Sequence, residues 1–133
     1  MGTALWAWGP AVALMGLIVW SSHQPDAGLN GFRPTIAGVD KMGHLGVYAL
    51  LSLSLLRALR RGPWRLSYRT ALWTSLAGAA LFGGSDELHQ SMVPGRTADP
   101  FDLLADCLGA GLAVLLAGWR GWERSPPGLE PKT

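Results

Sequence analysis

Long apolar stretches alternate with short polar segments along this chain, and the first stretch shows the pattern best. From Met1 to Trp20 there is no charged side chain. At about 1.5 Å of helix per residue, such a stretch crosses a hydrocarbon core of roughly 30 Å. Three further apolar stretches follow, so the sequence predicts an all-α, four-helix transmembrane bundle, a multi-pass protein of the cell membrane. The predicted helices cover about residues 4–20, 42–59, 70–90 and 101–119.

A cleaved signal peptide is the alternative interpretation of the first stretch. However, no basic residue precedes it, and no small-x-small cleavage site stands before Ser21. The pair Gly9-Pro10 fits a membrane helix, which tolerates it as a bend. An uncleaved helix is therefore favoured. Residues 1–120 are predicted to form one four-helix domain, and the charged, Pro/Gly-rich residues 121–133 a disordered cytoplasmic tail.

The composition supports a membrane protein. Hydrophobic residues make up 49% of the 133 residues and charged residues only 15%, below the roughly 25% of soluble domains. The seven Trp residues stand mostly near the ends of apolar stretches, where aromatic belts form at membrane interfaces; packing in a core is the alternative. The lone cysteine, Cys107, excludes an internal disulfide, and its apolar surroundings predict a packed, inert thiol.

Basic residues gather in one connection, between the second and third predicted helices. Positive-inside bias places this connection in the cytoplasm, and with four spans both termini then lie in the cytoplasm as well. The net charge of +2 is explained by this topology, so no nucleic-acid partner is predicted. The basic residues of this connection are Arg57, Arg60, Arg61, Arg65 and Arg69.

Most acidic residues gather at the opposite, outer face of the predicted bundle. A carboxylate at membrane depth costs about 2.5–3.5 kcal/mol, so several of them must face one another across the bundle instead of lipid. The expected counter-charges are Lys41, Arg96 and a protonated His44. A purely structural network at the helix ends is the alternative to a functional site. The predicted site consists of Lys41, His44, Asp86, Glu87, Gln90, Arg96, Asp102 and Asp106, with Tyr48 as a supporting hydrogen-bonder.

These residues stand in motifs with a recognisable order. The motifs are Ser21-Ser22-x-x-Pro25, Asp40-Lys41-x-x-His44-x-x-x-Tyr48, Asp86-Glu87-x-x-Gln90-x-x-x-Pro94-Gly95-Arg96 and Asp102-x-x-x-Asp106-x-x-Gly109. Their order and spacing resemble the VanZ-like family over roughly residues 18–115. Asp106 departs from the family's pattern, in which Asn is expected at this position, and it adds an acid to the site.

The resemblance implies an integral membrane protein of the cell envelope, related to a protein associated with resistance to the glycopeptide antibiotic teicoplanin. Lys and Arg side chains bind phosphate, and Asp86 or Glu87 fits the role of a general base. We therefore expect the site to bind or act on the phosphate-bearing head group of a membrane lipid or glycolipid at the outer leaflet. An enzyme and a binding protein are both open, because the residues define no reaction.

Other functions are also open. No cofactor is predicted, and a divalent cation held by hard oxygen and imidazole ligands is a minority alternative. Residues 86–90 are not a zincin motif, which needs two histidines at i, i+4. A small transporter would require homo-oligomers, because four short helices leave little room for alternating access. A non-catalytic accessory protein would use the polar network to shape a surface for an envelope-protein partner. The alternative metal ligands are His44, Asp86, Glu87, Asp102 and Asp106.

Two histidines are set apart from this site. His89 lies beside the polar face of its helix and is predicted to be an ordinary interfacial residue. His23 follows the first apolar stretch and is predicted to be solvated.

Overall fold

The fold is known from a computed structural model, which describes residues 2–24 and 38–119. Within these residues there are four helices and no strand, so the all-α, four-helix prediction is confirmed. Each predicted stretch lies within one observed helix, which extends it by at most three residues at either end. The predicted tail, residues 121–133, lies outside the described residues. The helices are α1 (Gly2–Ser22), α2 (Val39–Arg61), α3 (Tyr68–Gln90) and α4 (Pro100–Trp119).

Three of the four helices are long and apolar enough to cross a membrane. The stretches that qualify are Ala4–Ser22 in α1, Lys41–Arg61 in α2 and Pro100–Trp119 in α4. The α3 helix has 23 residues, as α2 does, but it is richer in Gly, Ser and Thr and ends in a polar segment. Its length matches the prediction of a fourth span, but α3 is not among the helices that qualify as apolar enough.

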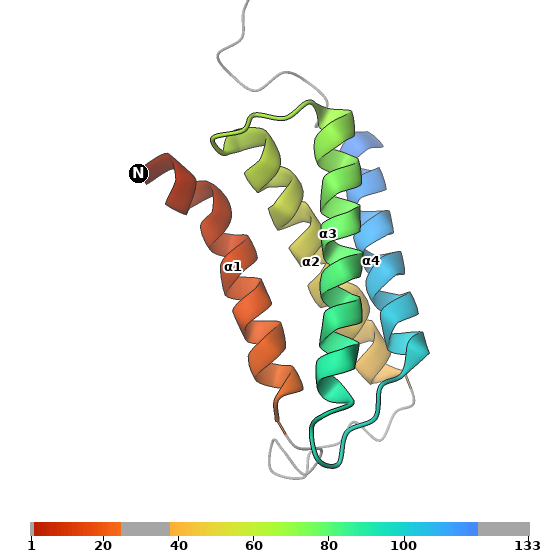
Figure 1. The fold of residues 1–133 in the computed structure, drawn as a ribbon. Helices are drawn as coiled ribbons and strands as arrows, with labels where there is room; N and C mark the ends of the chain where they lie inside the picture. The colour runs from red at the N-terminus through yellow and green to blue at the C-terminus, as the bar shows by residue number, and fades with distance from the viewer. Residues whose placement is uncertain (1, 25–37, 120–133) are drawn as a thin grey trace, which may run out of the picture.

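The helices run alternately up and down, and α2 packs against each of the other three, most extensively against α4 (Figure 1). We call one end of the bundle the arginine-rich end: it holds the start of α1, residues 62–67 and the end of α4. The opposite end, which we call the polar end, holds the end of α1, the start of α2 and residues 91–99. The start of α1 and the end of α4 therefore lie at the same end of the bundle.

At the arginine-rich end, contacts of aromatic and arginine side chains hold the helices together. The guanidinium of Arg57 lies 3.8 Å from the centre of the Trp6 ring and donates a 3.1 Å hydrogen bond to the Trp6 carbonyl oxygen. The Trp8 and Trp64 rings meet edge to face, with centroids 5.3 Å apart. These contacts attach α1 to α2 and to the connection that follows α2.

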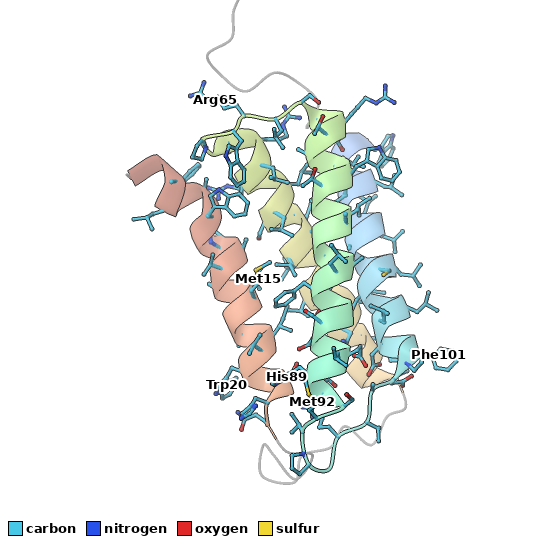
Figure 2. All side chains as sticks on the ribbon, viewed as in Figure 1. Met15, Trp20, Arg65, His89, Met92 and Phe101 are labelled. Atoms are coloured by element: carbon cyan, nitrogen blue, oxygen red, sulfur yellow. The ribbon has the colours of Figure 1, made fainter. Side chains whose placement is uncertain are left out.

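The outer surface of the bundle is apolar. Large exposed side chains include Leu50, Leu81 and Leu115, and Figure 2 shows Trp20 and Phe101 projecting outward near the polar end. An apolar surface of this extent is typical of helices that contact lipid. Cys107 also lies exposed on α4, so the prediction of a packed thiol is wrong: its apolar neighbours in the sequence form an outer face of α4.

Candidate functional site

The structure brings the eight predicted site residues to the polar end of the bundle. They come from three helices and from the connection between α3 and α4, and they form three adjoining groups of contacts. Glycines allow the helices that carry them to approach closely. A Cβ on Gly109 of α4 would overlap the carbonyl oxygen of Leu45 on α2, so only glycine permits this separation.

The first group is centred on Lys41, at the start of α2. Its Nζ atom lies 2.7 Å from a carboxylate oxygen of Asp99 and 2.7 Å from one of Asp102. Asp99 also caps the start of α4: its side-chain oxygen accepts a hydrogen bond from the Phe101 amide at 2.9 Å. Its own amide donates to Glu87 at 2.8 Å. Lys41 thus fastens the start of α2 to the start of α4.

Asp99 is absent from the predicted site, although the sequence held a signal for it. An acidic residue directly before a proline that opens a helix commonly satisfies the free amides of the first turn. The Lys41 ammonium, helped by the Phe101 amide, holds the pKa of the Asp99 carboxyl below its ordinary value. Asp99 is therefore an ionised partner of Lys41 at neutral pH.

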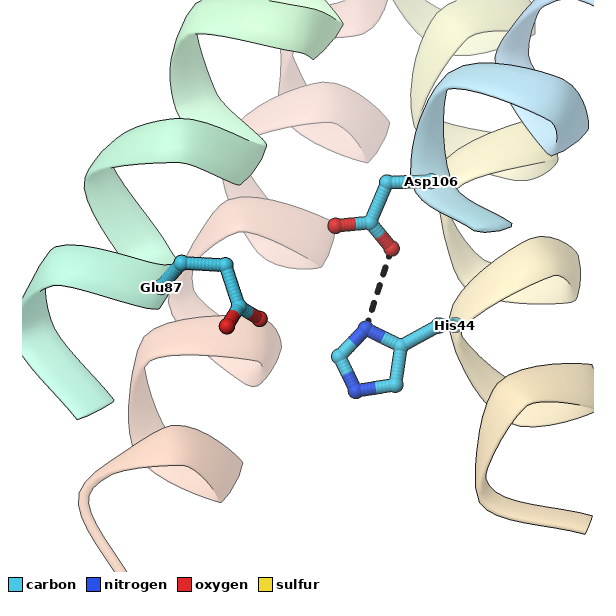
Figure 3. Close-up of side chains that lie close together, drawn as sticks. All are labelled: His44, Glu87 and Asp106. Carbon is cyan, nitrogen blue, oxygen red and sulfur yellow. Dashed lines mark hydrogen bonds and ion pairs between the residues drawn. The ribbon is translucent and has the colours of Figure 1, made fainter. Parts of the chain in front are cut away.

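The second group pairs His44 with Asp106 in the interior (Figure 3). His44 Nδ1 lies 3.0 Å from Asp106 Oδ1, and Asp106 is only 1% exposed. The other ring nitrogen, Nε2, lies 3.9 Å from Asp102 Oδ2. The imidazole of His44 is therefore flanked by two carboxylates of α4, one against each nitrogen.

Glu87 faces this pair from α3 (Figure 3). A ring nitrogen of His44 and one carboxylate oxygen each of Glu87 and Asp106 all lie within 4.8 Å of one another. Three ligand-type groups from three helices thus converge on one point.

Several buried polar atoms around this point have no hydrogen-bond partner among the described residues. They are Tyr48 Oη, Asp86 Oδ1, Glu87 Oε1 and Asp106 Oδ2. The prediction of Tyr48 as a hydrogen-bonder is therefore wrong. Its ring instead stacks at 6.5 Å on His44 and lies 6.5 Å from Phe82. The position of Tyr48 on the polar face of α2 brings its ring, but not its hydroxyl, into the network.

Gly83 leaves space beside Asp106. A Cβ on Gly83 would lie 3.0 Å from Asp106 Oδ2 and 3.3 Å from both Tyr48 Cε1 and Leu103 Cδ1. Any larger residue would press on the unpaired carboxylate oxygen. Gly83 therefore shapes the site as well as allowing α3 to pack.

The third group runs from Asp86 through Gln90 to Arg96. Gln90 Nε2 donates to Asp86 Oδ2 at 2.9 Å and to Ser22 Oγ at 3.4 Å. Arg96 Nη1 donates to Gln90 Oε1 at 3.4 Å. Buried Ser22, the second serine of the Ser21-Ser22 motif, thereby attaches the end of α1 to the site.

The remaining contacts of Arg96 correct the prediction that it compensates the carboxylates. Its Nε donates to the Gln24 carbonyl at 3.1 Å, and its Nη2 to the Ser21 carbonyl at 3.1 Å. No carboxylate of the described residues pairs with it. The direction of the chain after α3 turns Arg96 toward α1, which spacing along the sequence does not reveal.

His23 and His89 lie outside the buried cluster, and only their contact with each other was not predicted. His23 Nδ1 lies 3.3 Å from His89 Nε2, and the two rings stack with centroids 5.5 Å apart. The pair is exposed at the edge of the polar end. It adds a contact between α1 and α3 outside the buried cluster.

The fold and the site together define an all-α membrane protein with buried ionisable residues at one end of the bundle. The family model of VanZ/LLP1 matches residues 8–120. Because this match covers most of the chain, the protein belongs to the VanZ/LLP1 family, and the resemblance found in the sequence is confirmed.

One curated relative is "Uncharacterized protein C11E3.10" of Schizosaccharomyces pombe (strain 972 / ATCC 24843). It is 36% identical over 89 residues, which are 65% of this chain and 52% of the relative. The match thus spans about half the length of that protein. No solved structure matches the chain.

Proposed function

We propose that the polar end binds the phosphate-bearing, anionic head group of a membrane lipid or glycolipid. The observation that carries this proposal is the environment of Arg96. Its guanidinium is held by two backbone carbonyls and one side-chain amide, all neutral acceptors. Its positive charge is therefore uncompensated within the described residues, although it lies beside a membrane-spanning bundle.

The geometry of Arg96 suits a phosphate group. A guanidinium has five N–H donors, and the three hydrogen bonds named above use one on each nitrogen. One N–H is left on each of the two terminal nitrogens. Donors on the two terminal nitrogens of a guanidinium can bind two phosphate oxygens at once. The partly exposed side chain of Arg96 allows a ligand to reach them.

Lys41 has a different role from Arg96. Two carboxylates already lie 2.7 Å from its ammonium, so its charge is used to hold α2 against α4. We therefore assign the head-group contact to Arg96 and a positioning role to Lys41.

Apolar side chains around the polar end support a lipid as the source of the phosphate. Trp20 is 58% exposed, Met92 69% and Phe101 65%, and all three lie near the polar end (Figure 2). Acyl chains that contact these side chains would bring their head group to the level of Arg96. A soluble phosphate compound has no acyl chains and would gain no affinity from these side chains.

Native mass spectrometry of the detergent-purified protein tests the proposal. We expect the wild type, supplied with phosphatidic acid in phosphatidylcholine, to retain phosphatidic acid selectively. The Arg96→Gln variant should lose this selectivity because it lacks the charge, and Arg96→Lys should recover part of it. Arg61→Gln is the matched control, because Arg61 lies at the arginine-rich end and its loss should change nothing at the polar end.

Equal retention of both lipids by the wild type would overturn the proposal, as would selectivity that survives Arg96→Gln. A parallel titration with inorganic phosphate separates the two sources of the anion. Binding of free phosphate without lipid selectivity would contradict a lipid head group.

A further inference from the structure

We propose that His44, Glu87 and Asp106 form a binding site for a divalent transition-metal cation, of the class of Zn²⁺ or Mn²⁺. This site is separate from the contact of Arg96 with a head group and does not depend on it. The three residues come from α2, α3 and α4, and one ligand atom of each lies within 4.8 Å of the others.

The unpaired oxygens are the second observation behind this site. Glu87 is 7% exposed and Asp106 1%, yet Glu87 Oε1 and Asp106 Oδ2 have no partner among the described residues. A buried acceptor without a partner destabilises a protein, and more so if it is charged. Figure 3 shows the Glu87 carboxylate directed toward His44 and Asp106. A cation between the three side chains would satisfy both carboxylates.

Charge balance also favours a divalent cation. Two ionised carboxylates and a neutral imidazole carry a charge of −2, which one divalent ion neutralises. The Lys41 ammonium lies 2.7 Å from Asp99 and Asp102 instead. His44 is the base beside the two acids, and because it is neutral when it binds a metal, both carboxylates then need such compensation.

The ligand types indicate the class of metal. Imidazole suits Zn²⁺ and other transition metals, and carboxylates suit Mn²⁺ as well as Mg²⁺ and Ca²⁺. A set of one nitrogen and two oxygens is therefore better suited to Zn²⁺ or Mn²⁺ than to Ca²⁺, which takes six to eight oxygens. Zinc sites with three protein ligands leave a fourth position open to water or substrate.

Asp102, beside the other ring nitrogen of His44, suits the role of an outer-shell partner. If Nδ1 binds the metal, Nε2 carries the proton and faces Asp102 Oδ2, now 3.9 Å away. A carboxylate in this place orients a metal-bound histidine and fixes its tautomer. Asp102 would thus act on the metal through His44.

Only a small rearrangement is needed. Ligand atoms about 2.0–2.1 Å from a tetrahedral zinc lie roughly 3.3–3.4 Å from one another. His44 Nδ1 and Asp106 Oδ1 are already 3.0 Å apart. The main movement falls on Glu87, whose ligand atom lies within 4.8 Å of the other two and whose long side chain has several staggered rotamers.

Titration of the protein with the metal alone tests the site. The protein is purified in detergent, stripped with a chelator and titrated with Mn²⁺ while electron paramagnetic resonance measures free Mn²⁺; Zn²⁺ is then added as a competitor. We expect one Mn²⁺ per chain, displaced by Zn²⁺. Loss of even an outer-shell partner weakens metal sites about 10–100-fold, so the His44→Gln, Glu87→Gln and Asp106→Asn variants should each weaken binding about 100-fold or more.

A matched control carries the histidine substitution at the same end of the bundle but outside the buried cluster. His89→Gln removes a histidine paired with His23. It should bind Mn²⁺ as the wild type does. Arg96→Gln should also bind Mn²⁺ as the wild type does. Failure of the head-group proposal is therefore distinguishable from failure of the metal site.

The proposal is overturned if the folded wild type binds neither Mn²⁺ nor Zn²⁺, or if Asp106→Asn and Glu87→Gln bind as well as the wild type. Circular dichroism and size-exclusion chromatography of the metal-free variants show whether each is folded. If one ligand variant does not fold, the other two still test the metal site, because each removes a ligand from a different helix. Equal losses in the ligand variants and in the controls would also overturn the assignment.

Discussion

Gly109 of α4 lies so close to Leu45 of α2 that a Cβ on the glycine would overlap the carbonyl oxygen of the leucine. Leu45 directly follows His44, and Gly109 stands one helical turn after Asp106. The same approach that excludes a side chain at Gly109 therefore allows the 3.0 Å contact between His44 and Asp106. In a membrane, where lipid provides no hydrophobic drive for helix association, such small residues determine how closely helices pack.

Gly109→Ala should separate α2 from α4. Forcing extra atoms into a packed interface destabilises proteins by about 1–3 kcal/mol, and the backbone of Leu45 cannot turn aside as a side chain can. Thermal unfolding in detergent, followed by circular dichroism, measures this effect. Gly111→Ala is the control, because a Cβ there meets nothing within 4 Å. Equal unfolding temperatures for the two variants would contradict the close contact.

Tyr48→Phe should be neutral or slightly stabilising. The Tyr48 hydroxyl is buried without a partner among the described residues, so its removal ends an unfavourable burial while the ring contacts stay. Tyr68→Phe is the matched comparison, because the Tyr68 hydroxyl donates to the Val114 carbonyl at 3.2 Å. That variant should lose about 1 kcal/mol. Denaturant titration of both variants measures the difference, and a larger loss for Tyr48→Phe would show that its hydroxyl has a partner.

The ion pair of Asp99 with Lys41 should contribute to stability in a pH-dependent way. The native pKa of Asp99 is held below its ordinary value, which is about 3.9. As the pH falls, the unfolded state therefore binds the proton first, and the contribution is lost as the pH falls through the native pKa. The difference in unfolding temperature between wild type and Asp99→Asn should be constant from about pH 8 to 5 and shrink below about pH 4.

A double-mutant cycle provides the control for this pH dependence. In a Lys41→Met background, Asp99→Asn should have little effect at any pH, because the partner of the carboxylate is gone. Asn keeps the side-chain oxygen that accepts from the Phe101 amide, so the start of α4 is preserved. A difference that changes between pH 6 and 7 would instead implicate a histidine.

The membrane orientation can be measured with single cysteines in a Cys107→Ser background. The arginine-rich end should face the cytoplasm, so a membrane-impermeant thiol reagent applied to intact cells should label Thr97→Cys and spare Pro63→Cys. Both positions are exposed and lie at opposite ends of the bundle. Permeabilised cells should show labelling of both. The opposite pattern in intact cells would reverse the orientation.

The sequence by itself determined the helices, the end of the bundle at which the ionisable residues gather, and the family. Apolar length and helical spacing are local properties, and they define which residues share a helix face. They predicted that Lys41, His44 and the acids of the fourth helix would gather at one end of the bundle, because carboxylates in a membrane-spanning helix must face other helices.

Only the tertiary structure decided how these residues are paired. The turn after α3 directs Arg96 to the end of α1 instead of to the acids, and the start of α4 brings Asp99 to Lys41. The convergence of Glu87 with His44 and Asp106 likewise depends on three helices at once. The physical reason is that the distances between helices are set by contacts far apart in the sequence, such as that of Gly109 with Leu45, while spacing along one helix describes only that helix.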